Sequence, residues 1–533
     1  MKKEFKKLMA MGLVLVMAAS VTACGGNEGD KSKQNATESD TAAGQIGGET
    51  KAASGASETA GKTDLLIAIP GEPTTLDPYA HSLYYGFIPS TFIFDTLVTT
   101  DDNGEYIPEL ATEWEFVDDT TLHLKLREGV TFHNGNPFTA EDVAFTLKTA
   151  AESSFSNALF GCIDYENIDV EDDYNLTVKL KYAYAPLMEV LSSYRAGMLD
   201  KETYESVGAD AYGRQPIGTG PMKLSDWVSG DRIVFAANDT YWGDSLPYQT
   251  CTMRVIVEAS SRTIELETGG VDIAVDIPFS DWSRVEGTDG ITLVSGQTDV
   301  LASLVFNNSQ ELFQDIRVRQ ALAYGLDLNA LVQTCWEGTA DVADSFYAKS
   351  LLGYKKEGPM EYNVDKAKEL LAEAGYPDGL SFKYTTYQTT LNQTFAEVLQ
   401  SMWSKIGVNI EIDIVDLATY TQMNNSGELT ACLLTPSVAI SDPAAALILW
   451  PITRTISLRH NDQKIQDLLN QGSSAYNDAD RVKAYEELQD YLYEKTYTVP
   501  VAYTKFAFGI QNNVDGFTFS SSQVPDLTKV TLR

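Results

Sequence analysis

The spacing of apolar residues predicts helices that alternate with strands along most of the chain. Residues 363–377 place apolar side chains at helical intervals between Asn363, a favourable N-cap residue, and Gly375, a favourable helix end. Residues 408–414 alternate strictly, which predicts a strand with valine and isoleucine on one face and polar residues on the other. Helices and strands that alternate in this way indicate an α/β fold.

Two shorter patterns predict local backbone structure. Thr139 precedes a segment of helical periodicity and is expected to cap a helix whose first turn carries Glu141 and Asp142. In the run "GTGP", Gly218 and Gly220 are expected to adopt backbone angles that are closed to other residues.

The N-terminus has a different pattern. A basic head is followed by an apolar run over residues 8–21, which is too short to cross a bilayer easily, and then by small residues before Cys24. This order resembles a bacterial lipoprotein signal, which implies removal of residues 1–23 and a diacylglycerol on Cys24. An ordinary secretory signal with an incidental cysteine is the alternative. Residues 24–63 contain no aromatic residue, so we expect a disordered tether there.

Composition limits the classes of partner. Lys and Arg total 39 against 75 Asp and Glu, for a formal net charge of −36. This balance argues against nucleic acid or an anionic surface as partner. The chain beyond residue 64 is too long for one core, so two or three subdomains are expected. After the N-terminal run, no segment has the length of unbroken apolar sequence that a transmembrane helix needs.

The cysteines and histidines show no metal or redox spacing. The cysteines beyond Cys24 are Cys162, Cys251, Cys335 and Cys432. They lie too far apart for a zinc ribbon or a CxxC pair. Export permits disulfides, but we favour four free, buried thiols. The histidines are His81, His123, His133 and His460, with no HExxH spacing, so no metal site of the protein's own is predicted.

Eight segments in fixed order resemble one protein family. They are "TTLDPY" (74–79), "IPELATEWE" (107–115), "LREGVTFHNGNPFTAEDVAFTL" (126–147), "PIGTGPMKLSDW" (216–227), "NDTYWG" (238–243), "FQDIRVRQALAYGLD" (313–327), "AKELLAEAGY" (367–376) and "IGVNIEI" (406–412). Together they are similar to the extracellular solute-binding proteins of family 5, the oligopeptide, dipeptide and nickel binders of ABC importers. Each segment also has a plain structural role in turns and helices, so the signature marks the scaffold rather than the ligand.

The resemblance implies an α/β, periplasmic-binding-protein-like fold of type II, with two lobes, a hinge, an interlobe ligand cleft and an extra subdomain. Carried onto this chain, lobe I takes residues 64–98, 185–298 and 500–533. The inserted subdomain takes residues 99–184, and lobe II takes residues 299–499. The chain then crosses between the lobes near residues 298 and 500, where the hinge is expected.

The resemblance also implies a function. We expect a substrate-binding lipoprotein on the extracytoplasmic face of the cell membrane, monomeric and without a cofactor, that captures a peptide or similar small ligand and delivers it to ABC permease subunits. An oligosaccharide or nickel-chelate binder, with His81 near the cleft, is the alternative. A protein that shows its closed state to a membrane receptor is another. An exported hydrolase has less support, because no GxSxG, SxxK or HExxH motif supplies a catalytic residue.

Peptide binders of the family carry a loop that resembles D-x-x-D/E-P, whose first acid holds the peptide ammonium. Here Asp442-Pro443 matches its end, but the ammonium position is Ala439. Asp442 is therefore either a substitute ligand-binding acid or the N-cap of the following helix. Aromatic and polar side chains at the expected lobe junction are the other ligand-binding candidates. They are Ser82, Tyr84, Tyr85, Phe87, Tyr387, Trp450, Arg454 and Tyr503.

Overall fold

A large mixed sheet forms the centre of the fold. The structure, a computed structural model, describes residues 62–533 except 82, 102, 437, 439 and 447–456. Strand β1 pairs in parallel with β10 and β11, and the sheet's other pairings are antiparallel. In spatial order the sheet contains β16 (Ala431–Leu434), β12 (Ile291–Phe306), β17 (Thr498–Gln511), β11 (Ile273–Val275), β1 (Asp64–Ile69), β10 (Thr250–Val255), β9 (Arg232–Ala237) and β8 (Met222–Val228), with β13 (Asp341–Val342) beside β17.

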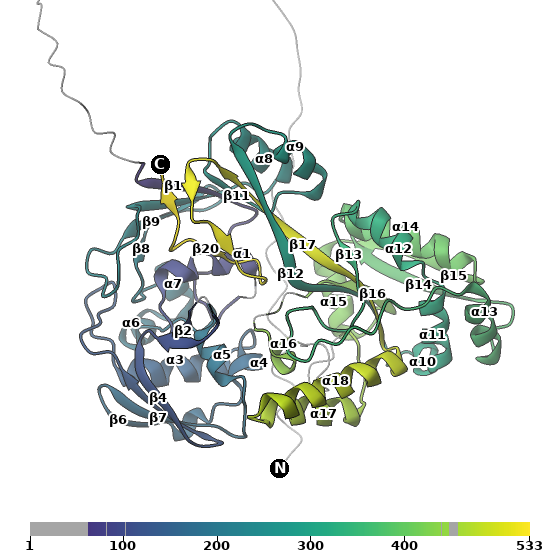
Figure 1. Ribbon diagram of the computed structural model, residues 1–533, viewed down its shortest axis with the longest axis horizontal. Helices are drawn as coiled ribbons and strands as arrows, with labels where there is room; N and C mark the ends of the chain where they lie inside the picture. Colours follow the sequence, from purple (N-terminus) through teal and green to yellow (C-terminus); the bar gives the residue numbers. More distant parts are fainter. Residues whose placement is uncertain (1–61, 82, 102, 437, 439, 447–456) are drawn as a thin grey trace, which may run out of the picture. The chain divides into compact units, whose positions relative to one another are not determined.

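Two long strands, β12 and β17, pair along most of their length (Figure 1). One end of the pair lies beside β16 and β13, and the other end lies beside β11. The register of the β12–β17 pairing shifts between Gln297 and Leu301 and again between Ala302 and Ser303. Such irregularities bend a strand and increase its twist. The apolar cores separate at this bend, which divides the described chain into two lobes.

The first lobe is built from two cores, whose residues come from positions 65–291 and 506–530. One residue from elsewhere in the chain, Ile440, also packs in the larger of these cores. The lobe includes a four-stranded antiparallel sheet of β4 (Ala111–Asp118), β5 (Thr121–Leu126), β7 (Asn175–Lys179) and β6 (Asp169–Asp172). Its helices are α1 (Tyr84–Phe87), α2 (Ser90–Ile93), α3 (Ala140–Glu152), α4 (Asn157–Phe160), α5 (Leu187–Ser192), α6 (Lys201–Val207), α7 (Ala209–Arg214), α8 (Ala259–Glu267) and α9 (Trp282–Glu286). Its short strand pairs are β2 (Val98–Thr100) with β3 (Tyr106–Pro108), β18 (Val514–Asp515) with β21 (Thr531–Leu532), and β19 (Thr518–Phe519) with β20 (Pro525–Asp526).

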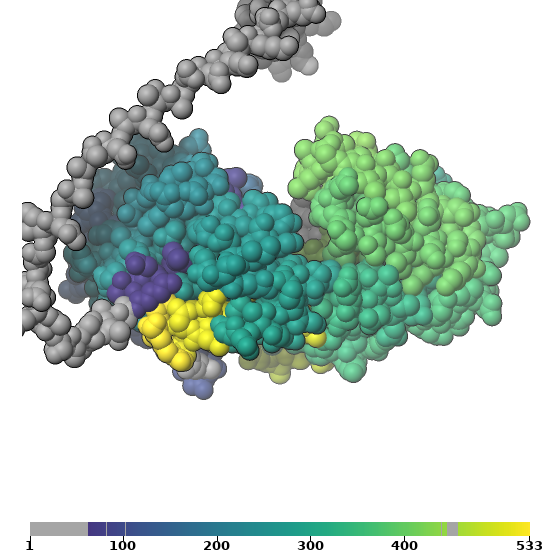
Figure 2. Space-filling view, turned by 90° about the horizontal axis from the view of Figure 1, so that it is seen from above, coloured from purple at the N-terminus to yellow at the C-terminus, as the bar shows by residue number. Residues whose placement is uncertain are grey.

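The second lobe is built from two cores whose residues all fall between positions 302 and 502. A parallel pair, β14 (Leu380–Tyr387) and β15 (Val408–Val415), packs against helices in the first of these cores. The helices of the lobe are α10 (Glu311–Gln314), α11 (Ile316–Tyr324), α12 (Leu328–Trp336), α13 (Val364–Glu373), α14 (Thr390–Ser404), α15 (Leu417–Ser426), α16 (Pro443–Ala446), α17 (Gln463–Ser474) and α18 (Asp478–Lys495). Figure 2 shows the surface hollowed between the teal part of the first lobe and the green part of the second.

Most of the predicted local structure is confirmed. Asn363 caps α13, accepting the amide of Lys366 at 3.0 Å, and Gly375 after the helix has a φ of +98°. Thr139 precedes α3, and its amide donates to Asp142 at 2.9 Å. The strand predicted at residues 408–414 is β15, in which Val408 and Ile410 are buried and Asn409 and Glu411 are exposed, while Ile414 near its end is 39% exposed.

The predicted reason for Gly218 and Gly220 is wrong. Neither glycine has a φ in the left-handed region. A Cβ on Gly218 would instead lie 1.9 Å from the carbonyl oxygen of Ile93, and one on Gly220 would lie 2.2 Å from that of Phe92. Close approach of the α2 backbone, and not backbone angle, therefore excludes side chains here.

The four cysteines of the folded part are free and buried, as predicted. Among the described residues, no helix is long and apolar enough to cross a membrane. No group of three or more His, Cys, Asp and Glu side chains in this part of the chain is placed to hold a metal ion.

Candidate functional site

Helix α1 carries three of the predicted ligand-binding residues. The Tyr84 ring lies 5.4 Å from the rings of both Tyr85 and Phe506. Tyr85 also packs over Gly71, because a Cβ there would lie 2.9 Å from its ring atoms. Tyr84 and Tyr85 remain half-buried, whereas Phe87 is fully buried. The two tyrosines are therefore the accessible aromatic residues of α1.

Phe87 forms the base of a buried cluster of cationic and aromatic groups. The His81 ring lies 4.3 Å from the Phe87 ring, and the Tyr194 ring lies 5.1 Å from it. The guanidinium carbon of Arg195 lies 4.4 Å from the centre of the same ring. We call these four residues the Arg195 cluster. A close approach of the chain at Gly86 holds His81 in place, since a Cβ there would lie 2.7 Å from the imidazole.

Several polar atoms of the Arg195 cluster have no hydrogen-bond partner among the described residues. Arg195 is only 9% exposed, yet it makes no hydrogen bond or ion pair with any residue that the structure describes. Both ring nitrogens of His81 and the hydroxyl of Tyr194 also have no partner within the described residues. Burial, with a contribution from Arg195, lowers the pKa of His81 to about 4, so the imidazole is neutral at pH 7. With respect to the described residues, the cluster thus holds a largely buried cation without a counter-charge and two hydrogen-bonding side chains, His81 and Tyr194, without a partner.

Such an arrangement is costly in the absence of a partner. The Nε of Arg195 is buried without a hydrogen-bond partner among the described residues, and a largely buried cation without a counter-charge is unfavourable. Arg pairs with carboxylates through two parallel hydrogen bonds. The cluster is therefore chemically suited to a carboxylate. Sequence reasoning missed Arg195, although an arginine among the small and apolar residues of "YRAGML" was a usable signal.

An accessible carboxylate lies beside Tyr84. Asp276 follows β11 with a φ of +61°, an unusual conformation for a residue other than glycine. Arg262 fixes this turn by donating to the Asp276 carbonyl at 2.8 Å, and its guanidinium lies 3.6 Å from the Asp276 carboxylate. The side chain of Asp276 stays 45% exposed. Burial raises its pKa, while Arg262 and the neighbouring Tyr84 hydroxyl oppose that rise.

Asp442, the predicted substitute for the ammonium acid, is fully buried and paired. Its carboxylate accepts from the Arg481 guanidinium at 2.6 Å and from the Tyr485 hydroxyl at 2.8 Å. It also accepts the amide of Ala444 at 2.8 Å, as the N-cap side chain of α16 does. These contacts occupy the carboxylate within the second lobe, and they favour the N-cap alternative.

The remaining predicted residues are dispersed. Tyr387 lies half-buried at the end of β14, with its ring 5.0 Å from that of Tyr420. Tyr503 on β17 is 1% exposed and donates its hydroxyl to Asp344 at 2.9 Å. Ser82, Trp450, Arg454, the ammonium position Ala439 and the lipidation residue Cys24 lie outside the described residues.

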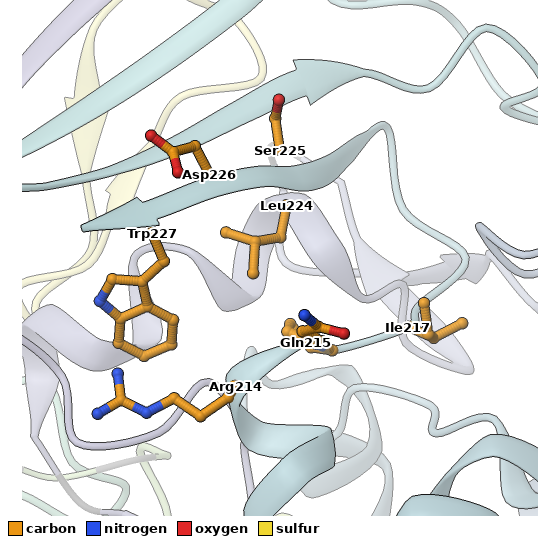
Figure 3. A pocket seen from close by; sticks show the side chains of 8 residues that line it. Arg214, Gln215, Ile217, Leu224, Ser225, Asp226 and Trp227 are labelled. Atoms are coloured by element: carbon orange, nitrogen blue, oxygen red, sulfur yellow. The ribbon is translucent and has the colours of Figure 1, made fainter. Parts of the chain in front are cut away.

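A separate depression of about 640 Å³ lies on the first lobe, between the end of α7 and β8. Figure 3 shows the Arg214 side chain directed at the Trp227 ring, and the guanidinium carbon lies 4.2 Å from the ring centre. Arg214 is also 3.6 Å from Glu72, and the Trp227 indole donates to Glu72 at 2.8 Å. Because its cation is paired, unlike Arg195, this depression is the weaker ligand site. None of the predicted ligand-binding residues lines it.

Comparison with known proteins agrees with this architecture. The glutathione-binding protein GsiB of Escherichia coli (strain K12) is 25% identical over 472 residues, which cover 85% of this chain and 91% of GsiB. The solved structure of AgaA from A. tumefaciens R10 in complex with agropinic acid has a TM-score of 0.77 and 26% identity, and the match covers 88% of this chain and 99% of AgaA. DppA from Helicobacter pylori in complex with peptide STSA has a TM-score of 0.79 and 24% identity over 89% of this chain and 98% of DppA. The sequence profile of the bacterial extracellular solute-binding proteins, family 5, matches residues 105–455, and the chain belongs to that family.

Proposed function

We propose that the ligand of this ABC-importer solute-binding protein carries a carboxylate, and that Arg195 binds it. The observation that carries this proposal is the buried guanidinium without a partner among the described residues. His81 and Tyr194 supply hydrogen-bonding groups beside it. A ligand carboxylate would offset the cost of the buried charge and gain strength from the dry surroundings.

Two relatives support a carboxylate. GsiB is named for glutathione, and AgaA was solved with agropinic acid. Both compounds carry carboxylates, as any peptide with a free C-terminus does. A peptide is therefore the favoured ligand. A neutral oligosaccharide has no carboxylate to offer, and a nickel chelate fits Arg195 only through an acidic chelator.

The ammonium of such a peptide needs a different partner from Asp442, which is already paired with Arg481. Asp276 is the accessible carboxylate beside Tyr84. We assign it the cationic end of the ligand. Tyr84 and Tyr85 would then cover the middle of the ligand with their half-exposed rings.

A matched set of peptides tests this assignment. The best-binding peptide of a library, found by thermal shift, is titrated calorimetrically as the free acid, the C-terminal amide and the N-acetylated form. We expect amidation to weaken binding at least a hundredfold, about 2.7 kcal/mol, and acetylation to weaken it less, because Asp276 is solvent-accessible. Equal affinity of the acid and the amide would contradict the role of Arg195. Binding of an oligosaccharide and of no peptide would contradict a peptide ligand but leave the import role intact.

We propose that the two lobes close on this ligand about a hinge. The hinge lies where the paired strands β12 and β17 pass from one lobe to the other. We propose boundaries of 64–98, 185–298 and 500–533 for the first lobe and 299–499 for the second, with 99–184 as a subdomain of the first. The separation of the cores at the register shift of β12 supports the division between the lobes near residue 298. On the return strand, Val501 and Ala502 still pack in the core of the second lobe. Ligand binding should then lower the radius of gyration in small-angle scattering.

The protein is proposed to act as a monomer, tethered to the outer face of the membrane by a lipid on Cys24 and residues 24–63. The sequence order of basic, apolar and small residues before that cysteine supports the anchor. Members of the family are binding proteins, and we propose that this chain likewise has no catalytic activity.

A further inference from the structure

Residues 440–442, which follow β16 of the second lobe, make contacts with both lobes. Ile440 is 6% exposed and packs into the core of the first lobe. Ser441 donates its amide to the carboxylate of Glu189, on α5 of the first lobe. The carbonyl of Ser441 accepts from Leu352 of the second lobe at 3.0 Å. Asp442 faces back into the second lobe, where it is fully buried. The segment therefore joins the two lobes.

Glu189 is the charged residue of an otherwise apolar helix. Four of the six residues of α5 are buried, and the sequence "LMEVLS" has Glu189 as its single ionisable group. Burial raises the pKa of Glu189, and the Ser441 amide opposes this rise. A partly buried carboxylate needs a hydrogen-bond donor. The donor here comes from the opposite lobe, so this hydrogen bond exists only while the lobes are in contact.

Other contacts join the lobes near α5. The amide of Ala185, two residues before α5, donates to the carbonyl of Ser473 in α17 at 2.7 Å. The hydroxyl of Tyr476 donates to the carbonyl of Asp119 at 2.9 Å, and its ring lies 5.7 Å from that of Phe116. These contacts add two lobe-to-lobe hydrogen bonds to the one that Glu189 makes with Ser441.

We infer that Glu189, Ile440 and Ser441 form a clasp that holds the lobes closed, and that the strength of this clasp sets how much of the ligand-free protein is closed. Ile440 contributes apolar packing against the core of the first lobe, and the Glu189–Ser441 hydrogen bond fixes the geometry of the contact. The Asp442–Arg481 pair acts behind the clasp as a positioning pair, because it fixes the backbone that presents the Ser441 amide. The clasp does not depend on the ligand or on the role proposed for Arg195.

Hydrogen exchange and small-angle scattering on the ligand-free full-length chain test the clasp. In Glu189→Ala, we expect the amides of Ser441 and Ala185 to exchange about tenfold faster or more, as the loss of a hydrogen bond to a charged group predicts. The radius of gyration should rise in the same variant. Glu189→Gln keeps an acceptor oxygen and should stay close to wild type. Ile440→Ser should act like Glu189→Ala.

Two controls remove residues of the same kind elsewhere. Glu113→Ala deletes an exposed carboxylate of the first lobe, and Ile414→Ser changes an exposed isoleucine of the second. Neither should alter exchange at Ser441 or the scattering curve. Thermal unfolding of every variant separates opening from loss of fold, and if Ile440→Ser unfolds, the two Glu189 variants decide. Unchanged exchange at Ala185 and an unchanged radius of gyration in Glu189→Ala would overturn the clasp, even if Ser441 alone exchanged faster.

Discussion

The guanidinium of Arg195 stacks 4.4 Å above the Phe87 ring, and no described carboxylate pairs with it. A cation held against an aromatic face is partly stabilised by the ring, but its hydrogen-bond donors remain unused. A residue that is kept at such a cost in the free protein is typical of a binding site.

Arg195→Met separates binding from stability. We expect the variant to lose at least a hundredfold in affinity for the peptide acid while its melting temperature stays the same or rises, because an unpaired buried charge has been removed. The measurements are calorimetric titration and thermal unfolding. Arg232→Met, at an exposed arginine, is the matched control. A fall in melting temperature with unchanged affinity would show that Arg195 is structural.

Asp442→Asn should destabilise the protein rather than change its ligand preference. It leaves the Arg481 guanidinium, 14% exposed, without its buried ion-pair partner and with only the exposed Asp478, at 3.2 Å, as a counter-charge. Breaking one partner of a buried pair costs about 3–5 kcal/mol. We expect this loss in urea unfolding, and recovery of most of it in Asp442→Leu combined with Arg481→Leu. If Asp442→Asn were instead stable and lost a preference for free over acetylated peptides, Asp442 would bind the ligand ammonium.

Glu109 predicts a pH-dependent stability. Its carboxyl accepts from the Thr96 hydroxyl at 2.5 Å, and burial, together with the nearby Asp95, raises its pKa to about 7. A raised carboxyl pKa means that the folded state binds its proton more tightly, so the stabilisation is present below about pH 4.5 and is lost as the pH rises through 7. The free energy of unfolding should therefore decline over this range by at most about 3 kcal/mol. Glu109→Gln should remove this decline in urea unfolding between pH 4.5 and 8, and an unchanged pH profile would contradict it.

Cys24→Ser tests the anchor. Without a thiol, no diacylglycerol can be attached, so we expect the protein to be released from the membrane or to persist as an uncleaved precursor. Fractionation of cells followed by immunoblotting and intact-mass measurement distinguishes these outcomes. Membrane-bound protein processed like the wild type would show that the N-terminus is not a lipoprotein signal.

Local rules in the sequence predicted helix starts and strand faces well, because those depend on near neighbours. Asn363 and α13 follow from capping chemistry and apolar spacing within one segment. The roles of Gly218 and Arg195 did not follow. Gly218 is constrained by the carbonyl of Ile93, which lies 125 residues away in the sequence. Arg195 lacks a hydrogen-bond partner among the described residues because the fold brings no acceptor of these residues close to it. Sequence periodicity carries neither kind of information.

The pairing of Asp442 also depends on contacts with residues that are distant in the sequence. Its position before Pro443 predicted a helix N-cap or a ligand-binding acid, and both depend on the local segment alone. Its strongest contacts, to Arg481 and Tyr485, come from a helix about forty residues later. Only the packing of α18 against this loop decides that the carboxylate is occupied.

Both cores of the second lobe draw their residues from one uninterrupted stretch, which leaves the first lobe along β12 and returns along β17. A gene therefore encodes this lobe as a single exchangeable block, whereas the first lobe is assembled from separate pieces. Recombination with a relative at these two strands would graft a new second lobe in one event. Specificity in such proteins can then change by replacing the second lobe while Arg195, on the first lobe, is inherited intact.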